Sequence, residues 1–264
     1  MPRSSDERPD QQLTMRIRVF STGRARRKRG ERGLRRYFAD DWADETLPVN
    51  VFLIEHPRGL CLVDAGQTAE ATTPGYFPGW YPFFRLARFE LGPGDEAAAQ
   101  IESAGFDVND VRWVVLTHLH TDHVGGLAAF RGAEVIVARA EWEPAQGPGG
   151  RLRGYLPQRW PRGLQPRIVD FTGPAIGPFL HSLDIAEDGR LLFVPLPGHS
   201  RGHAALLVRD GEHPSYLCAG DAALRASELA AQSPGVAEWC RRERVTILAS
   251  HDDAALRPLD EHST

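Results

Sequence analysis

The stretch THLHTDHVGG at residues 117–126 decides how this chain folds and what it can bind. It places three histidines and one aspartate within six positions, directly after the apolar run WVVL at residues 113–116. An apolar run that leads into a polar turn is typical of a buried strand ending at a ligand loop. Imidazole nitrogen and carboxylate oxygen are ligands that zinc and related divalent metals prefer. His118 and His120 can face one ion while Asp122 and His123 face another, so the spacing predicts two neighbouring metal ions rather than ordinary core or surface histidines.

This stretch resembles the H-x-H-x-D-H signature of the metallo-β-lactamase fold superfamily, and the resemblance implies further ligands at later strand ends. The sequence has a suitable residue in each place: His199 after the apolar run at 191–194, Asp221 after 215–217, and His251 after 246–249. The ligand set that the resemblance implies is His118, His120 and His199 on one metal ion, Asp122, His123 and His251 on the other, and Asp221 between them. The ions are expected to be zinc, with iron, manganese or cobalt as alternatives.

Apolar runs and helix-like segments alternate along the chain, which indicates an α/β class. We expect strands at residues 15–20, 49–55, 60–63, 113–117, 133–137, 191–196, 204–208, 216–219 and 245–249. Helical segments are expected at 94–103 and, apart from Pro234-Gly235, at 227–240, and a short helix is expected to start at 140–142. Residues 146–178 are expected to form a long loop, and residues 1–13 to be disordered ahead of a single domain at 14–264. The resemblance adds the four-layer αββα sandwich.

Two further polar residues are expected to support the ligands rather than bind metal. Asp64 lies in a D-x-G turn, where the resemblance implies an aspartate that hydrogen-bonds near the ligand loop; a plain turn carboxylate is the alternative. His203 lies four residues after His199, and we expect it to support the ligands or the fold rather than to bind an ion.

The resemblance is nearest to the N-acyl-homoserine lactone lactonases that quench quorum sensing. It implies that a metal-bridging hydroxide attacks the lactone carbonyl, with Asp122 and Asp221 taking part in catalysis. Asp122 can also pass a proton to the leaving group. The chain departs from these lactonases at Leu224, where they usually carry a tyrosine that contacts the lactone carbonyl. Another donor would have to reach in from a loop, and the candidates are Tyr76, Tyr81 and Tyr155, or else the substrate differs.

An aromatic stretch at residues 75–89 contains seven aromatic side chains interrupted by proline and glycine, so it is not expected to form a regular strand or helix. It can cover a pocket for an apolar acyl chain, pack on the domain or contact a second copy in a homodimer. The residues predicted to line a substrate pocket are Phe77, Trp80, Tyr81, Phe83, Phe84 and Leu224.

Other functions use the same ligands. A thioester hydrolase of the glyoxalase II type would need cationic groups, which Arg151, Arg153, Arg159 and Arg162 could provide. A phosphodiesterase or nuclease could use the same metals, and the basic run at residues 24–36 would suit its substrate. The aromatic stretch suits an apolar substrate better, so nucleic acid is not expected as a partner. A β-lactamase, a non-catalytic binding protein and a flavodiiron-type oxidoreductase rank lower.

The composition is that of an ordinary globular protein, with 42% hydrophobic and 25% charged residues and a net charge of −4. Residues 24–36 carry a local charge of +7, which a solvated loop or an arginine-rich strand edge explains as well as a nucleic-acid surface. The three cysteines, Cys61, Cys218 and Cys240, form no C-x-x-C pair, which indicates free thiols and a cytoplasmic location. We find no membrane span and no secretory signal.

Overall fold

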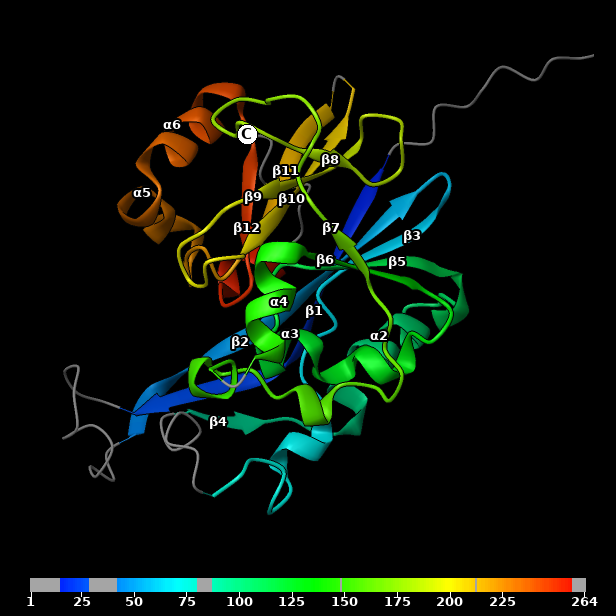
Figure 1. Ribbon diagram of the computed structural model, residues 1–264, viewed down its shortest axis with the longest axis vertical. Coiled ribbons are helices and arrows are strands. Elements are labelled where there is room, and N and C mark those ends of the chain that lie inside the picture. Colours follow the sequence, from blue (N-terminus) through cyan, green and yellow to red (C-terminus); the bar gives the residue numbers. More distant parts are fainter. Residues whose placement is uncertain (1–14, 29–41, 80–86, 148, 212, 258–264) are drawn as a thin grey trace, which may run out of the picture.

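The computed structural model describes residues 15–28, 42–79, 87–147, 149–211 and 213–257, and its strands form two sheets (Figure 1). The first sheet has seven strands in the order β4-β1-β2-β3-β5-β6-β7 and the second has five in the order β12-β11-β10-β9-β8. The strands of the first sheet are β1 Arg16–Lys28, β2 Trp42–His56, β3 Gly59–Val63, β4 Ala87–Glu90, β5 Val111–Leu116, β6 Glu134–Ala138 and β7 Arg167–Val169. Those of the second are β8 Leu183–Asp184, β9 Leu191–Pro195, β10 Ala204–Asp210, β11 His213–Gly220 and β12 Thr246–Ala249.

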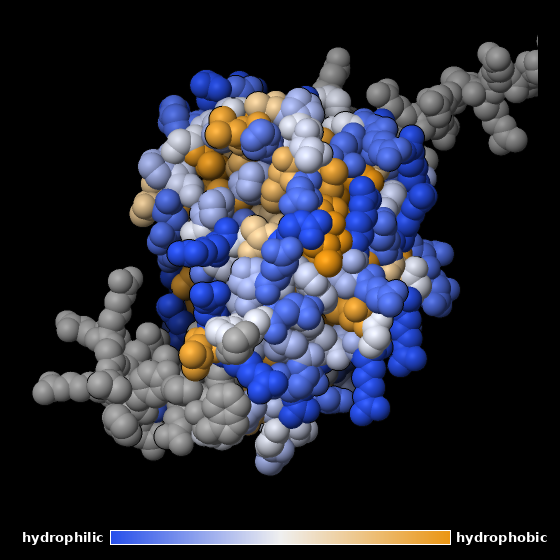
Figure 2. Space-filling model, in the orientation of Figure 1, coloured by the Kyte–Doolittle hydropathy of each residue, from blue (hydrophilic) through white to orange (hydrophobic). Residues whose placement is uncertain are grey.

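Three apolar clusters hold four layers together. The central cluster lies between the sheets and includes Phe52 and Val115 from the first sheet and Phe193 from the second. A second cluster packs helices α2 Ala97–Ser103 and α4 Arg139–Gln146 on the first sheet, and a third packs α5 Leu229–Gln232 and α6 Pro234–Glu243 on the second. Hydrophilic residues cover most of the face in Figure 2, as expected when the apolar faces are buried between layers. The predicted αββα sandwich is confirmed.

Strand direction brings the polar strand ends together. Strand β3 is parallel to β5, and β11 is parallel to β12. Strand β10 is antiparallel to both β9 and β11, so β9 points the same way as β11. The five segments that carry the predicted site residues therefore leave the two sheets at one edge of the sandwich.

Most of the expected elements are confirmed, including the hairpin β2–β3 and the strand that leads into residues 117–126. The helix expected at 94–103 begins at Ala97, after a 3₁₀ turn at Pro93–Asp95. Residues 146–178, predicted to be an insertion or a long loop, also contain the short strand β7. Strands β4 and β8 were also missed. All three are short edge strands, and their order comes from pairing with β1, β6 and β9 rather than from an apolar pattern of their own.

The beginning of the basic run is a strand and not a loop. Arg24 and Arg26 lie in β1, where Arg24 pairs with Asp253 and Arg26 with Glu90, each at 2.9 Å. This supports the arginine-rich strand among the explanations for the charge. Residues 29–36 of the run lie outside the described residues, as do the N-terminal residues 1–13. None of the helices in the part of the chain that the structure describes has the length and apolar character needed to cross a bilayer.

Candidate metal centre

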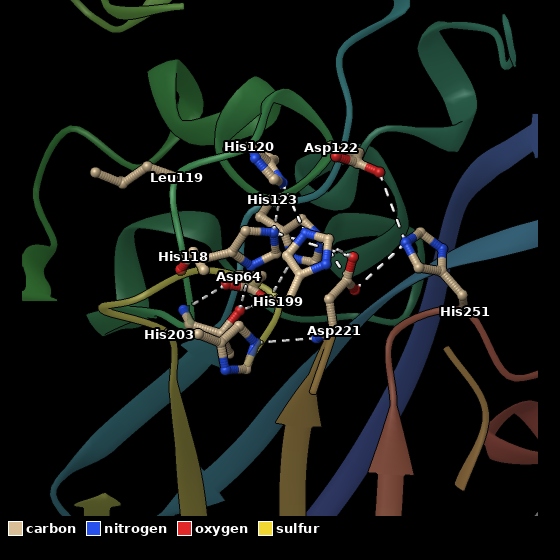
Figure 3. Close-up of polar contacts among 12 residues, drawn as sticks. Asp64, His118, Leu119, His120, Asp122, His123, His199, His203, Asp221 and His251 are labelled. Carbon is tan, nitrogen blue, oxygen red and sulfur yellow. Dashed lines mark hydrogen bonds and ion pairs between the residues drawn. The ribbon is translucent and has the colours of Figure 1, made fainter. Parts of the chain in front are cut away.

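The seven predicted ligand side chains converge at the common edge of the sheets (Figure 3). Three overlapping groups each place their ligand atoms within 4.8 Å of one another. The groups are His118–His120–His199, His118–His123–Asp221 and Asp122–His123–His251. Only the first and the last share no residue, so the geometry offers two adjoining positions for a cation. We refer to them as site 1 (His118, His120, His199) and site 2 (Asp122, His123, His251).

The Asp221 carboxylate lies between the two sites, with one oxygen toward each. Its Oδ2 is 3.6 Å from Nε2 of His199 and 4.0 Å from Nε2 of His118. Its Oδ1 is 3.3 Å from Nε2 of both His123 and His251. A carboxylate placed in this way can bridge two ions, which is the position that the sequence predicts for it.

The histidines of site 1 are oriented by hydrogen bonds on the side away from the centre. Nε2 of His120 donates to the Arg153 carbonyl at 2.8 Å, so Nδ1 is the nitrogen left to face the site. That Nδ1 lies 2.8 Å from Nε2 of His199 and 3.1 Å from Nε2 of His118. Nδ1 of His118 contacts the Thr117 hydroxyl at 3.1 Å. The nitrogens of His118 and His120 that carry no proton thus lie close to Nε2 of His199, an arrangement that suits a cation between the three rings.

The histidines of site 2 are oriented in the same manner. Nδ1 of His251 donates to the Pro48 carbonyl at 2.6 Å, and Nδ1 of His123 donates to the Asp64 carboxylate at 2.7 Å. Asp122 closes the group with Oδ2 3.7 Å from Nε2 of His251. Both Nε2 atoms therefore face the centre.

Asp64 is buried beneath both sites. Besides His123, it accepts hydrogen bonds from the backbone N–H and the hydroxyl of Thr117, each at 2.8 Å. The Thr117 hydroxyl therefore donates to Asp64 and accepts from Nδ1 of His118. Asp64 has a φ of 59°, in the left-handed region, as the D-x-G turn at the end of β3 requires.

His203 is buried but turned away from ligation. Its Nδ1 donates to the Leu196 carbonyl at 2.9 Å, and its Nε2 accepts the backbone N–H of Asp221 at 3.1 Å. Both nitrogens are occupied, and the ring is neutral. Burial lowers the pKa of His203 to about 3, although the charge of Asp221 opposes this shift.

Burial and charge divide the site histidines into two kinds. Burial, reinforced by the neighbouring imidazoles, holds the pKa of His118 well below its usual range, and burial lowers the pKa of His120 to about 4. Burial also lowers the pKa of His123 and His251, but Asp221 and a second carboxylate outweigh it. The pKa of His123 is left well above its usual range and that of His251 is about 9. Site 2 thus attracts positive charge, even though its histidines are buried.

Two buried atoms support a cation in this place. Nε2 of His123 and Oδ1 of Asp221 are buried and lie 3.3 Å apart, but neither makes a hydrogen bond of good geometry among the residues that the structure describes. Orphaned polar atoms of this kind are costly unless an ion or a water satisfies them. Two divalent cations would meet the carboxylates of Asp122 and Asp221, so the donor set fits the metal pair in both ligand type and charge.

Comparison with known proteins identifies the family. The model of the metallo-beta-lactamase superfamily matches residues 44–253. This chain belongs to the metallo-β-lactamase superfamily. It is 36% identical over 192 residues to a protein of Azorhizobium caulinodans named N-acyl homoserine lactonase AttM, covering 69% of this chain and 67% of that protein. A protein of Mycobacterium tuberculosis named as a probable metallo-hydrolase is 39% identical over 181 residues, covering 66% of this chain and 56% of the relative.

A solved structure shares the fold of this superfamily member. It is an N-acyl homoserine lactone hydrolase with the product N-hexanoyl-L-homoserine bound at its catalytic metal centre. The superposition has a TM-score of 0.68 and covers 90% of this chain and 93% of the other, at 20% identity. Similarity at this identity concerns the fold alone.

A pocket of about 440 Å³ opens beside site 1. His120 and His199 form part of its wall, together with Leu152, Arg153, Tyr155 and the loop at residues 198–202. Of the residues predicted to line a substrate pocket, Phe77 and Leu224 do not contribute to this one. Phe77 packs instead on Tyr76 and Phe89, with ring centroids at 4.8 and 6.0 Å.

The other predicted pocket residues, Trp80, Tyr81, Phe83 and Phe84, lie outside the described residues. Phe89, at the end of the aromatic stretch, belongs to edge strand β4, so the stretch is not irregular throughout.

Several residues of the centre carry no signal in the sequence. Pro48 and Arg153 contribute backbone carbonyls, which every residue type has, so the sequence does not indicate them. Gly154 offers a weak signal, because a Cβ at this residue would lie 2.7 Å from Nε2 of His120, and its φ is +103°. Glu141 looks like an ordinary helix residue in the sequence, yet it is buried beside the ligand loops.

Proposed function

We propose that this chain is a metal-dependent hydrolase that opens the lactone ring of N-acyl homoserine lactones. The observation that carries the proposal is the pair of adjoining His/Asp sites that share the Asp221 carboxylate. The lactonase name of the A. caulinodans relative supports the choice of a lactone among ester substrates.

We propose that site 1 and site 2 each hold one divalent ion and that Asp221 contacts both. When bound, the ions supply Lewis acidity for an ester carbonyl and lower the pKa of water toward about 7. Five imidazoles among seven ligands suit zinc, while iron, manganese and cobalt also accept this donor set. Elemental analysis of the purified protein distinguishes these metals.

The chain's own residues orient the substrate and handle the proton. The His199 side chain is 30% exposed, whereas those of His118 and His123 are almost completely buried, so the ester approaches from the side of His199. Asp122 has a side chain that is 16% exposed and lies at the edge of site 2. It is placed to hold a proton for the departing alkoxide, in addition to its role as a ligand.

The donor that replaces the missing tyrosine at Leu224 has to come from elsewhere. The Tyr155 hydroxyl is directed at the side chains of Glu141 and Ser200, and burial raises its pKa. The Tyr76 hydroxyl lies 3.4 Å from the Thr121 hydroxyl, next to Asp122, and its ring is buried. Of the two candidates within the described residues, Tyr76 is the better placed, because the hydrogen bond that the structure gives its hydroxyl is a long one, to Thr121. We therefore expect Tyr76→Phe to lower lactone turnover more than Tyr155→Phe lowers it.

A thioester hydrolase acting on an anionic substrate is the second candidate, and the pocket beside site 1 favours it. Arg153 and Arg201 line this pocket, and both side chains are exposed. Arg159, by contrast, donates to the carbonyls of Gly75 and Tyr76 and lies over the Tyr76 ring, so it is not available to a substrate. Arg162 lines a different pocket.

A hydrolysis panel separates these functions. It compares N-acyl homoserine lactones of several chain lengths with a glutathione thioester, a cephalosporin and a phosphodiester, all with metal-loaded protein. The lactones should give the highest kcat/KM, and Arg153→Gln with Arg201→Gln should leave their hydrolysis within about threefold. A higher kcat/KM for the thioester that falls tenfold or more in this double variant would replace the lactonase proposal with the second candidate.

We further propose a small-molecule substrate with an apolar acyl part and a cytoplasmic location. Cys61, Cys218 and Cys240 are free and buried, which suits a reducing compartment. The predicted homodimer stays a prediction.

A further inference from the structure

Glu141 is a buried carboxylate that has no place among the proposed ligands. It lies near the beginning of α4 and is 1% exposed. A buried carboxylate is costly unless hydrogen bonds compensate it. Its partners therefore show what the structure uses it for.

Each hydrogen bond of Glu141 goes to a segment that carries or supports a site 1 ligand. Oε1 accepts the backbone N–H of Leu119, the residue between His118 and His120, at 3.0 Å. Oε2 accepts the hydroxyl of Ser200, the residue after His199, at 2.6 Å. One carboxylate thus ties together the two loops that supply all three site 1 histidines.

A third contact ties in the segment that orients His120. The Tyr155 hydroxyl lies beside Glu141, and burial together with the charge of Glu141 raises the pKa of that hydroxyl. Tyr155 pairs with His120 through a β-bridge, and their rings lie 5.3 Å apart. Arg153, two residues earlier, provides the carbonyl that sets the tautomer of His120.

The backbone allows this arrangement because the second ligand loop approaches α4 very closely. A Cβ at Gly202 would lie 2.1 Å from the backbone nitrogen of Glu141. Only glycine fits there, and its absence of a side chain lets Ser200 reach the carboxylate. Leu119 and Ser200, the residues that hydrogen-bond Glu141 within the described part of the chain, flank ligands of site 1, and neither is next in sequence to a ligand of site 2.

We propose that Glu141 is a positioning residue that holds the three histidines of site 1 in ligand geometry and leaves site 2 to other supports. The inference rests on the metal pair proposed above but not on the identity of the substrate. Replacing an outer partner of a metal ligand typically weakens metal binding about 10–100-fold. Because Glu141 supports only one of the two sites, its replacement should weaken the binding of only one of the two metal ions.

Stepwise titration of the metal-free protein with Co²⁺, followed by absorbance and by competition with a chelator, measures the two steps separately. His199→Ala identifies the step that belongs to site 1. Glu141→Ala should weaken that step about 10–100-fold and leave the other within about threefold. Ser200→Ala, which removes only the arm toward the His199 loop, should weaken the same step by less.

Glu143→Ala is the matched control, because Glu143 lies on the same helix with a side chain that is 63% exposed. It should leave both steps unchanged. Glu141→Gln keeps an oxygen for the Leu119 N–H, so it should recover most of the affinity. If Glu141→Ala does not fold, Ser200→Ala and Glu141→Gln decide the question in the same titration.

The role of Glu141 would be overturned if Glu141→Ala bound both Co²⁺ ions with wild-type affinity, or if both binding steps were weakened equally. In those cases the wild-type protein still binds two ions, so the proposed metal centre stands. A wild-type protein that binds fewer than two ions would refute the metal pair itself, and the role of Glu141 with it.

Discussion

Replacing Asp64 by asparagine tests how the tautomers of the ligand histidines are set. The change keeps the volume of the side chain, and asparagine tolerates the left-handed φ of 59° at this residue. Oδ2 of Asp64 accepts both Nδ1–H of His123, at 2.7 Å, and the Thr117 hydroxyl, at 2.8 Å. An amide NH₂ in that place would face two donors, so His123 must move its proton from Nδ1 to Nε2, the nitrogen that faces the metal.

The expected losses of folding stability and of metal affinity follow from the hydrogen bonds that Asp64 makes. Loss of a hydrogen bond to a charged partner costs roughly 1.5–3 kcal/mol of folding free energy. Loss of an outer partner of a metal ligand weakens metal binding about 10–100-fold, or about 1.4–2.8 kcal/mol. The Thr117 hydroxyl connects Asp64 to His118 as well, so Asp64→Asn should weaken both binding steps, unlike Glu141→Ala.

Two measurements check this prediction. Urea unfolding of the metal-free protein gives the change in stability, and Co²⁺ titration gives the affinity of each step. Asp110→Asn is the control, because Asp110 is exposed and lies at the other end of β5 from the ligand loop. A folded Asp64→Asn protein that binds both ions with wild-type affinity would show that Asp64 does not set the tautomer of His123.

Three further predictions concern single residues. His120→Ala should abolish turnover and lower the metal content while circular dichroism shows an intact fold; near wild-type activity would reject His120 as a ligand. Gly154→Ala should push His120 away from the Arg153 carbonyl, because a Cβ there meets Nε2 at 2.7 Å, and should lower both metal content and the melting temperature. His56 should make the metal-free protein less stable in acid: burial lowers its pKa below 6.5, so the unfolded chain binds more protons as pH falls below 6.5. His56→Gln should therefore lose less stability than the wild type in urea unfolding between pH 7.5 and 5.5, and equal losses would contradict this.

The fold class and the ligand types could be predicted from the sequence because both depend on local patterns. Apolar runs that end in His or Asp mark buried strands with polar ends, and the H-x-H-x-D-H spacing joins three histidines and an aspartate in one turn. The strands before His199, Asp221 and His251 were found by the same pattern. Edge strands such as β7 and β8 were not, because two or three residues are too few to show an apolar pattern, and these strands depend on a neighbour for their hydrogen bonds.

Apart from Asp64, the residues that orient the ligands came only from the tertiary structure. Glu141 is 22 residues from Leu119 and 59 from Ser200, and Pro48 is 203 residues from His251. No local pattern reports such contacts, since backbone carbonyls are present in every residue and a helix glutamate is normally exposed. The sequence by itself determined which side chains can bind a cation and that they end strands. The face-to-face packing of the two sheets decided which nitrogen of each ring faces the centre, because that depends on partners brought together only when the distant segments fold.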